Sequence, residues 1–199
     1  MSQADRHVVH LQDGALAEVG AIIDRVAASR LYFVVDASAY SASGAATVLE
    51  PNFRDRAVTR FTDFDLNPKL HDVERGIEQF RQADPELMIA LGGGTAIDLG
   101  KLIGTLACHH ESARDIIMGN SAIRQSGPPL IAVPTTAGTG SEATHFAVAY
   151  VEGVKYSVAH SVLLPDYAIV DSTLTHSLPA SITASTGLDA FCQAIESIW

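Results

Sequence analysis

The fold is decided by the stretch L-G-G-G-T-A-I-D-L-G-K, residues 91–101. It follows residues 86–90, E-L-M-I-A, and its last residues open the mostly apolar run L-G-K-L-I-G-T-L-A, residues 99–107. Consecutive glycines permit backbone conformations that are closed to other residues, and they let a ligand approach the main chain without a Cβ in the way. We therefore predict a buried strand that ends in three glycines and passes at once into a helix.

This strand-to-helix turn also predicts a binding site. The N–H groups that open a helix have no intrahelical partner, and the positive end of the helix dipole favours an anion such as a pyrophosphate. The hydroxyl of Thr95 can add a further donor. A nucleotide phosphate site is the prediction, and a plain tight turn is the alternative, because short glycine patterns also occur without a ligand.

Length and composition describe a globular protein. The 199 residues are 47% hydrophobic and 18% charged, which is enough to bury one sizeable core. A formal net charge of −10 argues against a nucleic-acid partner, which needs a clustered basic surface. No signal peptide and no apolar run of membrane-spanning length are recognisable, so we expect a cytoplasmic protein without a membrane partner. Cys108 and Cys192 are predicted to be buried, reduced cysteines.

Strand and helix patterns alternate along the chain. This alternation predicts a largely parallel sheet with helices on both faces. Ligands of such sheets bind at the carboxyl ends of the strands, where Asp36, residues 92–94 and residues 134–141 fall. The predicted helices are 14–28, 41–49, 68–82 and 113–118, and the predicted strands are 31–35, 57–61, 130–133 and 168–170, with a hairpin of 146–151 and 156–158 around residues 152–154.

From Pro179 onward the pattern changes to one apolar helical stripe. The stripe consists of Leu188, Phe191, Cys192, Ile195, Ile198 and Trp199. The sequence ends within this pattern, without a helix-terminating glycine or proline. We therefore expect a nucleotide-binding domain, residues 1–178, followed by the start of a helical domain, residues 179–199, of a longer protein. The alternative is a terminal helix that docks on its own sheet.

Three groups of side chains could carry chemistry. Asp36 follows a strand and could accept from a ribose 2′-hydroxyl and repel a 2′-phosphate, or simply cap a helix. The loop P-T-T-A-G-T-G-S-E, residues 134–142, is dense in small donors that could bind phosphates or a ribose, although it could be only a polar connection. Asp189 and Gln193 lie four residues apart on one helix face, where a cation could bind, but an amide is a weak ligand. His109 and His110 follow a helix end and are expected to face solvent.

Four linked motifs resemble the iron-containing (group III) alcohol dehydrogenases. They are G-G-G-T-A-I-D-L-G-K from residue 92, P-T-T-A-G-T-G-S-E-A-T from residue 134, L-L-P-D-Y-A-I-V-D from residue 163 and T-G-L-D-A-F-C-Q-A-I-E-S from residue 186. The resemblance implies a Rossmann-like α/β domain, as in dehydroquinate synthase, followed by an all-helical metal domain with the active site in the cleft between them. It also implies binding of NAD, or alternatively NADP, and of Fe²⁺ or Zn²⁺ in the full-length protein.

The resemblance also assigns roles by position. Gly93, Gly94, Thr95 and Asp98 would hold the pyrophosphate region, Thr135, Thr136, Thr139 and Ser141 would line the cofactor, and Lys155 would contact its ribose or nicotinamide side. Asp36 would favour NAD over NADP, and Asp189 would be the first metal ligand. Many members of the family have histidine where this chain has Gln193, which places four-ligand iron in doubt without excluding a three-ligand metal site.

The implied reaction is hydride transfer between a nicotinamide and a small alcohol or aldehyde. The stretch K-Y-S-V-A-H-S-V-L-L-P-D, residues 155–166, is most similar to the phosphonoacetaldehyde reductase branch of the family. We expect a homodimer or a higher homo-oligomer, and we expect the 199-residue piece to be inactive alone. A lyase of the dehydroquinate synthase type and a non-catalytic nucleotide-binding fragment are the alternatives.

Overall fold

The computed structural model describes residues 7–198 and contains a six-stranded, fully parallel sheet. Its strand order is β1-β8-β5-β4-β2-β3. The strands are β1 (Val8–Leu11), β2 (Arg30–Val35), β3 (Ala57–Phe61), β4 (Leu87–Gly92), β5 (Leu130–Pro134) and β8 (Tyr167–Val170). The predicted fold class is confirmed.

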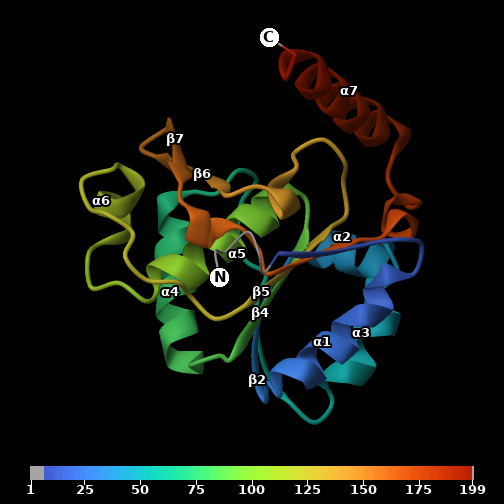
Figure 1. Cartoon of the computed structure of the whole chain (residues 1–199), viewed down its shortest axis with the longest axis horizontal. Helices are drawn as coiled ribbons and strands as arrows, with labels where there is room; N and C mark the ends of the chain where they lie inside the picture. The colour runs from blue at the N-terminus through green and yellow to red at the C-terminus, as the bar shows by residue number, and fades with distance from the viewer. Residues whose placement is uncertain (1–6, 199) are drawn as a thin grey trace.

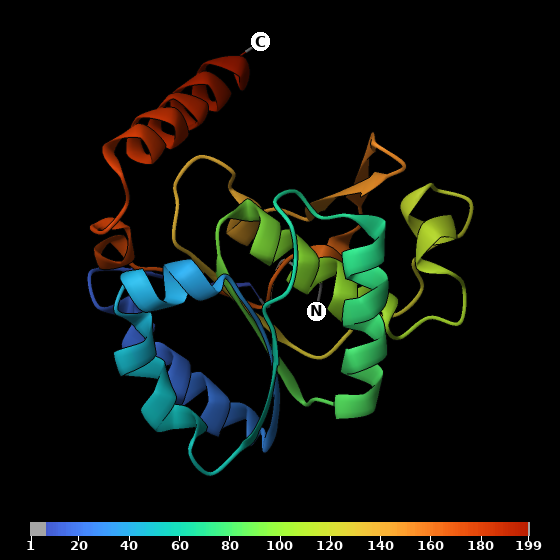
Figure 2. The ribbon, with the colours of Figure 1, turned by 180° about the vertical axis from the view of Figure 1, so that it is seen from behind.

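Helices cover both faces of this sheet. The helices are α1 (Glu18–Val26), α2 (Ala37–Ala42), α3 (Ala45–Phe53), α4 (Leu70–Ala83), α5 (Gly94–Leu106), α6 (Ala113–Ile117) and α7 (Ala180–Glu196). Figure 1 shows α1 and α3 on one side of the sheet and α4 and α5 on the other, and Figure 2 shows the same layers from behind. Two helical layers around one sheet are what strands that alternate with helices require.

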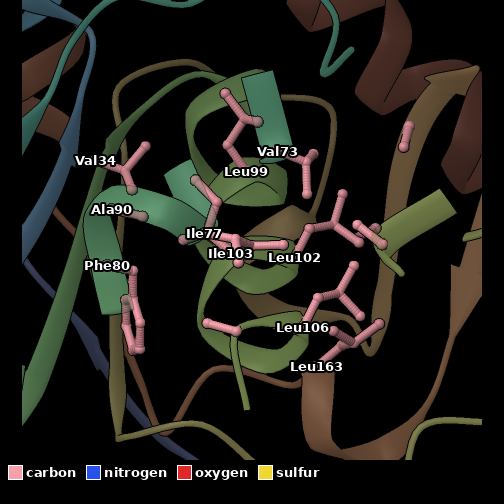
Figure 3. Packing of buried hydrophobic residues seen from close by; sticks show 14 of the residues in the cluster. Val34, Val73, Ile77, Phe80, Ala90, Leu99, Leu102, Ile103, Leu106 and Leu163 are labelled. Carbon is pink, nitrogen blue, oxygen red and sulfur yellow. The ribbon is translucent and has the colours of Figure 1, made fainter. Parts of the chain in front are cut away.

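The core consists of two clusters, one on each face of the sheet. Side chains alternate along β2, so that Phe33 belongs to the cluster with α1 and α3, whereas Tyr32 and Val34 belong to the cluster with α4 and α5. Figure 3 shows the second cluster, in which Leu99 and Ile103 of α5 lie among side chains of α4 and the sheet. Because α5 is buried along nearly its whole length, its N-terminus has a fixed position.

Two parts of the sheet-and-helix region differ from the prediction. Strand β1 was not predicted, because it lies at the edge of the sheet and its pattern is mostly exposed rather than alternating. The predicted helix 41–49 is two helices, α2 and α3, separated at Gly44, whose φ of 78° lies in the left-handed region.

A hairpin of β6 (Phe146–Val151) and β7 (Val154–Ala159) forms a separate antiparallel pair. Glu152 and Gly153 make its turn with φ values of 52° and 82°, as a tight two-residue hairpin requires. The hairpin was predicted, but β7 is longer than the expected residues 156–158. Val154 therefore belongs to a strand rather than to the turn.

Helix α7 projects away from the α/β layers (Figures 1 and 2). None of its residues is buried, and Leu188 and Phe191 of the predicted apolar stripe are 63% and 62% exposed. The helix therefore does not dock on the sheet within residues 7–198, and Trp199 of the stripe lies outside the described residues. The prediction that Cys192 is buried is wrong, because it lies on this exposed helix, and Cys108 is half-buried. The division into domains 1–178 and 179–199 stays a prediction.

No helix within residues 7–198 is both long and apolar enough to cross a lipid bilayer.

The close contact between α5 and the sheet gives a first prediction. A Cβ added to Gly100 would lie 2.7 Å from the Cβ of Ala90, which has no side-chain torsion to yield. A Cβ added to Gly104 would instead meet the side chain of Met88, which can change rotamer. Because overpacking outweighs the gain in helix propensity, we expect Gly100→Ala to lower the free energy of unfolding by about 1–2 kcal/mol. Gly104→Ala is the matched control on the same helix, and we expect it to cost less in urea unfolding. An equal or larger cost for Gly104→Ala would contradict this account of the packing.

Candidate functional site

A cleft of about 1080 Å³ lies at the carboxyl ends of the strands. Its volume slightly exceeds the roughly 300–1,000 Å³ that is usual for small-molecule sites, so it has room for an extended ligand such as a dinucleotide. All twelve residues singled out in the sequence line this one cleft: Asp36, Gly93, Gly94, Thr95, Asp98, Thr135, Thr136, Thr139, Ser141, Lys155, Asp189 and Gln193.

The strand order explains why the cleft lies there. The chain runs from β2 outward to β3 and then returns to the other side of β2 to form β4. Strands β2 and β4 therefore flank a point where the winding direction reverses, and a crevice opens at the carboxyl ends of such a strand pair. Asp36 follows β2 and Gly93 follows β4, so the two residues face each other across this crevice.

The glycine turn, residues 92–94, connects β4 to α5. Gly92 has a φ of 149°, and a Cβ there would lie 2.8 Å from the Cβ of Ala96. A Cβ on Gly94 would lie 2.9 Å from Cγ2 of Thr139. Among the described residues no side chain caps the N-terminus of α5, so its first N–H groups remain available to a ligand. This is the geometry of an anion site at a helix N-terminus.

Asp36 is the N-cap of α2. One oxygen of its carboxylate, Oδ1, accepts hydrogen bonds from the backbone N–H groups of Ser38 and Ala39, each at 3.0 Å, and from the Ser38 hydroxyl at 2.6 Å. Partial burial raises the pKa of Asp36, but these hydrogen bonds outweigh it, so the net pKa is lowered and the carboxylate is charged. Asp36 thus caps a helix, which was one of its two predicted roles. Its negative charge also lies at the cleft, as the other predicted role, contact with a cofactor ribose, would require.

Asp98 and Lys101, one turn apart on α5, both bind strand β6. The Asp98 carboxylate accepts a hydrogen bond from the Val148 N–H at 2.9 Å. The Lys101 ammonium donates to the carbonyl oxygens of Thr144 and Phe146 at 2.8 and 2.7 Å. These bonds hold the hairpin against α5, and the hairpin in turn places Lys155 at the cleft.

Burial changes the proton affinity of both groups. It raises the pKa of Asp98, which the Val148 hydrogen bond and the charges of Lys101 and Lys155 only partly offset. Burial also lowers the pKa of Lys101 from 10.5 to about 8, against the opposing effect of the Asp98 charge. Ser141 lies close enough to Asp98 to lower the pKa of its carboxyl group as well. Within residues 7–198, however, no hydrogen bond reaches Oδ1, the second carboxylate oxygen of Asp98. Asp98 is only 8% exposed, so this oxygen is a buried acceptor with unused capacity.

The threonine loop, residues 135–141, lines the cleft with Thr135, Thr136, Thr139 and Ser141. Its start is fixed by the Thr135 N–H, which donates to the Gly92 carbonyl at 2.9 Å. The Ser141 N–H donates to the Thr139 hydroxyl at 3.3 Å. Thr135 and Ser141 are buried, whereas Thr136 and Thr139 are more accessible, so the latter two offer hydroxyls to a ligand more directly.

Asp189 and Gln193 occupy the mouth of the cleft on α7. The Gln193 amide donates to the Asp189 carboxylate at 3.2 Å, so the two side chains lie together as their spacing predicts. No group of three or more His, Cys, Asp or Glu side chains suited to a metal occurs within residues 7–198. Asp189 and Gln193 alone therefore do not complete a metal site within these residues, and metal binding by the pair stays a prediction.

The structure adds cleft residues that the sequence analysis missed. Asn67, between β3 and α4, lines the cleft with a φ of 63°, and its N–H donates to the Thr95 hydroxyl at 3.2 Å. Tyr150 of β6 lines the cleft near it, and its N–H donates to the Pro68 carbonyl at 2.7 Å. The Asn-Pro pair was a recognisable turn signal, since asparagine tolerates the left-handed region.

The prediction that His109 faces solvent is wrong. Its side chain is 4% exposed, and its Nε2 accepts from the backbone N–H groups of Arg124 and Gln125 at 2.8 and 3.3 Å. The other ring nitrogen, Nδ1, lies 3.0 Å from the Thr105 carbonyl. His109 therefore fixes a loop on the side of α5 away from the cleft and has no part in the candidate site.

Comparison with known proteins agrees with this geometry. A family model described as iron-containing alcohol dehydrogenase matches residues 7–172. Long-chain-alcohol dehydrogenase 1 of Geobacillus thermodenitrificans (strain NG80-2) is 36% identical over 191 residues, which are 94% of this chain and 48% of the relative. 4-Hydroxybutyrate dehydrogenase of Cupriavidus necator is 35% identical over 193 residues, 95% of this chain and 50% of the relative.

A solved structure shares the fold closely. Sulfoacetaldehyde reductase from Bifidobacterium kashiwanohense, in complex with NAD⁺, superposes with a TM-score of 0.90 at 34% identity. The match covers 96% of this chain and 51% of that chain. The chain thus spans about half the length of the curated relatives that it matches.

The buried Lys101 predicts a pH dependence of stability. Because its pKa is about 8 in the folded protein and 10.5 is the ordinary value, the unfolded chain binds more protons between these limits. The free energy of unfolding of the wild type, relative to Lys101→Met, should therefore rise with pH across this window. The rise should be at most about 3 kcal/mol, since each unit of pKa difference is worth about 1.4 kcal/mol. Urea unfolding of both proteins from neutral to alkaline pH measures this change. If the difference in the free energy of unfolding between the two proteins did not vary with pH, the lowered pKa of Lys101 would be contradicted.

Proposed function

The chain belongs to the iron-containing alcohol dehydrogenase family, and from this premise we propose that the whole protein is an NAD-dependent alcohol dehydrogenase or aldehyde reductase. The observation that supports this most is the convergence of the glycine turn, Asp36, the threonine loop and Lys155 on one cleft. NADP is the alternative cofactor. The substrate would be a small alcohol or aldehyde.

The cleft suggests how the cofactor lies. The diphosphate would accept hydrogen bonds from the uncapped N–H groups at Gly94 and Thr95, since charge and geometry both favour an anion there. The adenosine ribose would then lie toward Asp36, on the β2 side of the crevice between the carboxyl ends of β2 and β4. Further into the cleft, the buried Oδ1 of Asp98 would accept from an N–H or O–H donor of the ligand, which would satisfy its unused capacity.

When bound, a nicotinamide cofactor would supply the hydride acceptor for an alcohol, and a metal ion held in part by Asp189 would supply Lewis-acid polarisation of the substrate oxygen. The described residues would bind and orient: the N-terminus of α5 would hold the diphosphate, and the Asp98–Lys101 pair fixes the hairpin that carries Lys155. The exposed ammonium of Lys155 at the cleft adds positive charge where an anionic cofactor or substrate would lie.

The test uses the whole protein, purified and supplied with Fe²⁺, Zn²⁺ or no metal. We expect cofactor reduction with small alcohols and cofactor oxidation with small aldehydes, among them phosphonoacetaldehyde and sulfoacetaldehyde. Sulfoacetaldehyde is included because the reductase of that name is a close structural neighbour. Product analysis separates the alternatives: a lyase of the dehydroquinate synthase type would show no net cofactor turnover. Absence of turnover with every substrate and metal would contradict the proposal, and NAD binding without turnover would favour a non-catalytic protein.

We also propose that the whole protein is a homodimer or a higher homo-oligomer. Light scattering of the whole protein would measure its mass and so its number of subunits.

Asp36 predicts the cofactor preference. In Asp36→Asn the amide oxygen still caps α2, but the negative charge that would repel a 2′-phosphate is gone. We expect the ratio of NADP affinity to NAD affinity to rise by about tenfold, equivalent to about 1.4 kcal/mol. Calorimetric titration with both cofactors measures it. Asp36→Ala, which also removes the cap, is the control, and it should lose stability as well. A wild type that prefers NADP, or an unchanged ratio in Asp36→Asn, would refute the role.

A further inference from the structure

Gly138 lies where the threonine loop meets α7. Its φ is +97°, and a Cβ on it would lie 2.7 Å from Oδ2 of Asp189 and 2.8 Å from the Thr186 carbonyl oxygen. Figure 1 shows the loop after β5 arching toward the start of α7. Because one of these two neighbours is backbone, a side chain at Gly138 could not be accommodated by a rotamer change alone. The helix or the loop would have to move.

A second glycine of the same loop shows that backbone conformation alone does not explain this contact. Gly140 also has a positive φ, +61°, but a Cβ there would meet only the side chain of Thr144, at 3.9 Å. Gly140 is therefore required only for its conformation, whereas Gly138 also permits the main chain to approach α7.

The contact bears directly on Asp189. One carboxylate oxygen, Oδ1, accepts from the Gln193 amide at 3.2 Å, and the other, Oδ2, faces Gly138. No residue of α7 is buried within residues 7–198, so the contacts that place the helix in this part of the chain are surface contacts such as this one.

The same loop also contacts the glycine turn. Thr139, next to Gly138, packs so closely on Gly94 that a Cβ on Gly94 would lie 2.9 Å from its Cγ2. The loop thus contacts the diphosphate-binding turn through Thr139 and the metal-binding helix through Gly138. We propose that Gly138 is a positioning residue, which sets the distance between the bound cofactor and the Asp189 carboxylate by allowing α7 to lie against the loop backbone. This inference rests on the proposed function.

The test compares Gly138→Ala with Gly140→Ala in the whole protein. We expect Gly138→Ala to lose less NAD affinity than Zn²⁺ affinity, because the uncapped N–H groups of α5 are unchanged and only the threonine loop would shift on the cofactor side. It should lose about tenfold or more in Zn²⁺ affinity, the usual size of effect when a group that orients a metal ligand is altered. Its kcat should fall, with little change in the KM for NAD. Gly140→Ala carries a comparable positive-φ strain in the same loop, but a Cβ there would not reach α7, so it should change the ratio of Zn²⁺ to NAD affinity less than Gly138→Ala does.

A measurement without cofactor or metal separates this inference from the proposed function. Hydrogen exchange of the α7 amides should become faster in Gly138→Ala and stay unchanged in Gly140→Ala, whether or not the protein is an enzyme. Equal exchange in the two variants would overturn the proposed contact. Unchanged Zn²⁺ affinity in Gly138→Ala, or a parallel loss of NAD affinity, would overturn the positioning role. A wild type that binds neither NAD nor metal would instead refute the proposed function.

Discussion

The approach of α5 to the sheet is the constraint on which the rest of the structure depends. Gly100 lies against Ala90 of β4 so closely that even one methyl group would have to displace the helix. With the helix held at this distance, the chain must turn from β4 into α5 within three residues, and Gly92 takes a φ of 149° to do so. The uncapped N-terminus of α5 then falls at the crevice beside β2. The close packing of small residues therefore also determines where the uncapped N-terminus of α5, the proposed anion site, lies.

The same helix carries the polar groups that attach the hairpin. Asp98 and Lys101 are both almost fully buried, which is costly for charged groups unless they are paired and hydrogen-bonded. Each compensates by binding the main chain of β6, which contributes a donor at Val148 and an acceptor at Phe146. Burial nonetheless leaves Asp98 with a raised pKa and one unused acceptor, an arrangement that stability alone does not require. The raised pKa and the unpaired oxygen of Asp98 are understandable if a ligand donates a hydrogen bond to that oxygen.

The sequence predicted the layers, and it predicted that the candidate residues fall at the carboxyl ends of the strands, because these features depend on local signals. Glycines after an apolar strand, a strand-end Asp36 and alternation of strands with helices are visible without long-range contacts. Strand β1 was missed because its side chains at the sheet edge do not alternate in burial. His109 and Asn67 were misjudged or missed because their partners, the Arg124 N–H and the Thr95 hydroxyl, are distant in sequence. Tertiary hydrogen bonds between side chain and backbone have no periodicity from which to predict them.

The two sides of the cleft differ in how firmly the fold holds them. The cofactor side is built on α5, β4 and β5, whose residues are buried, so its donors are fixed before a ligand arrives. The opposite side, with Asp189 and Gln193, is carried by a helix without a buried residue. Within residues 7–198 the helix therefore rests on contacts with the threonine loop rather than on a core. Because Gly138 has no Cβ, its main chain can lie against Asp189 and Thr186 of α7 without displacing the loop residues that line the cleft. The placement of Asp189 relative to α5 and the glycine turn thus depends on the close approach of one loop to one helix.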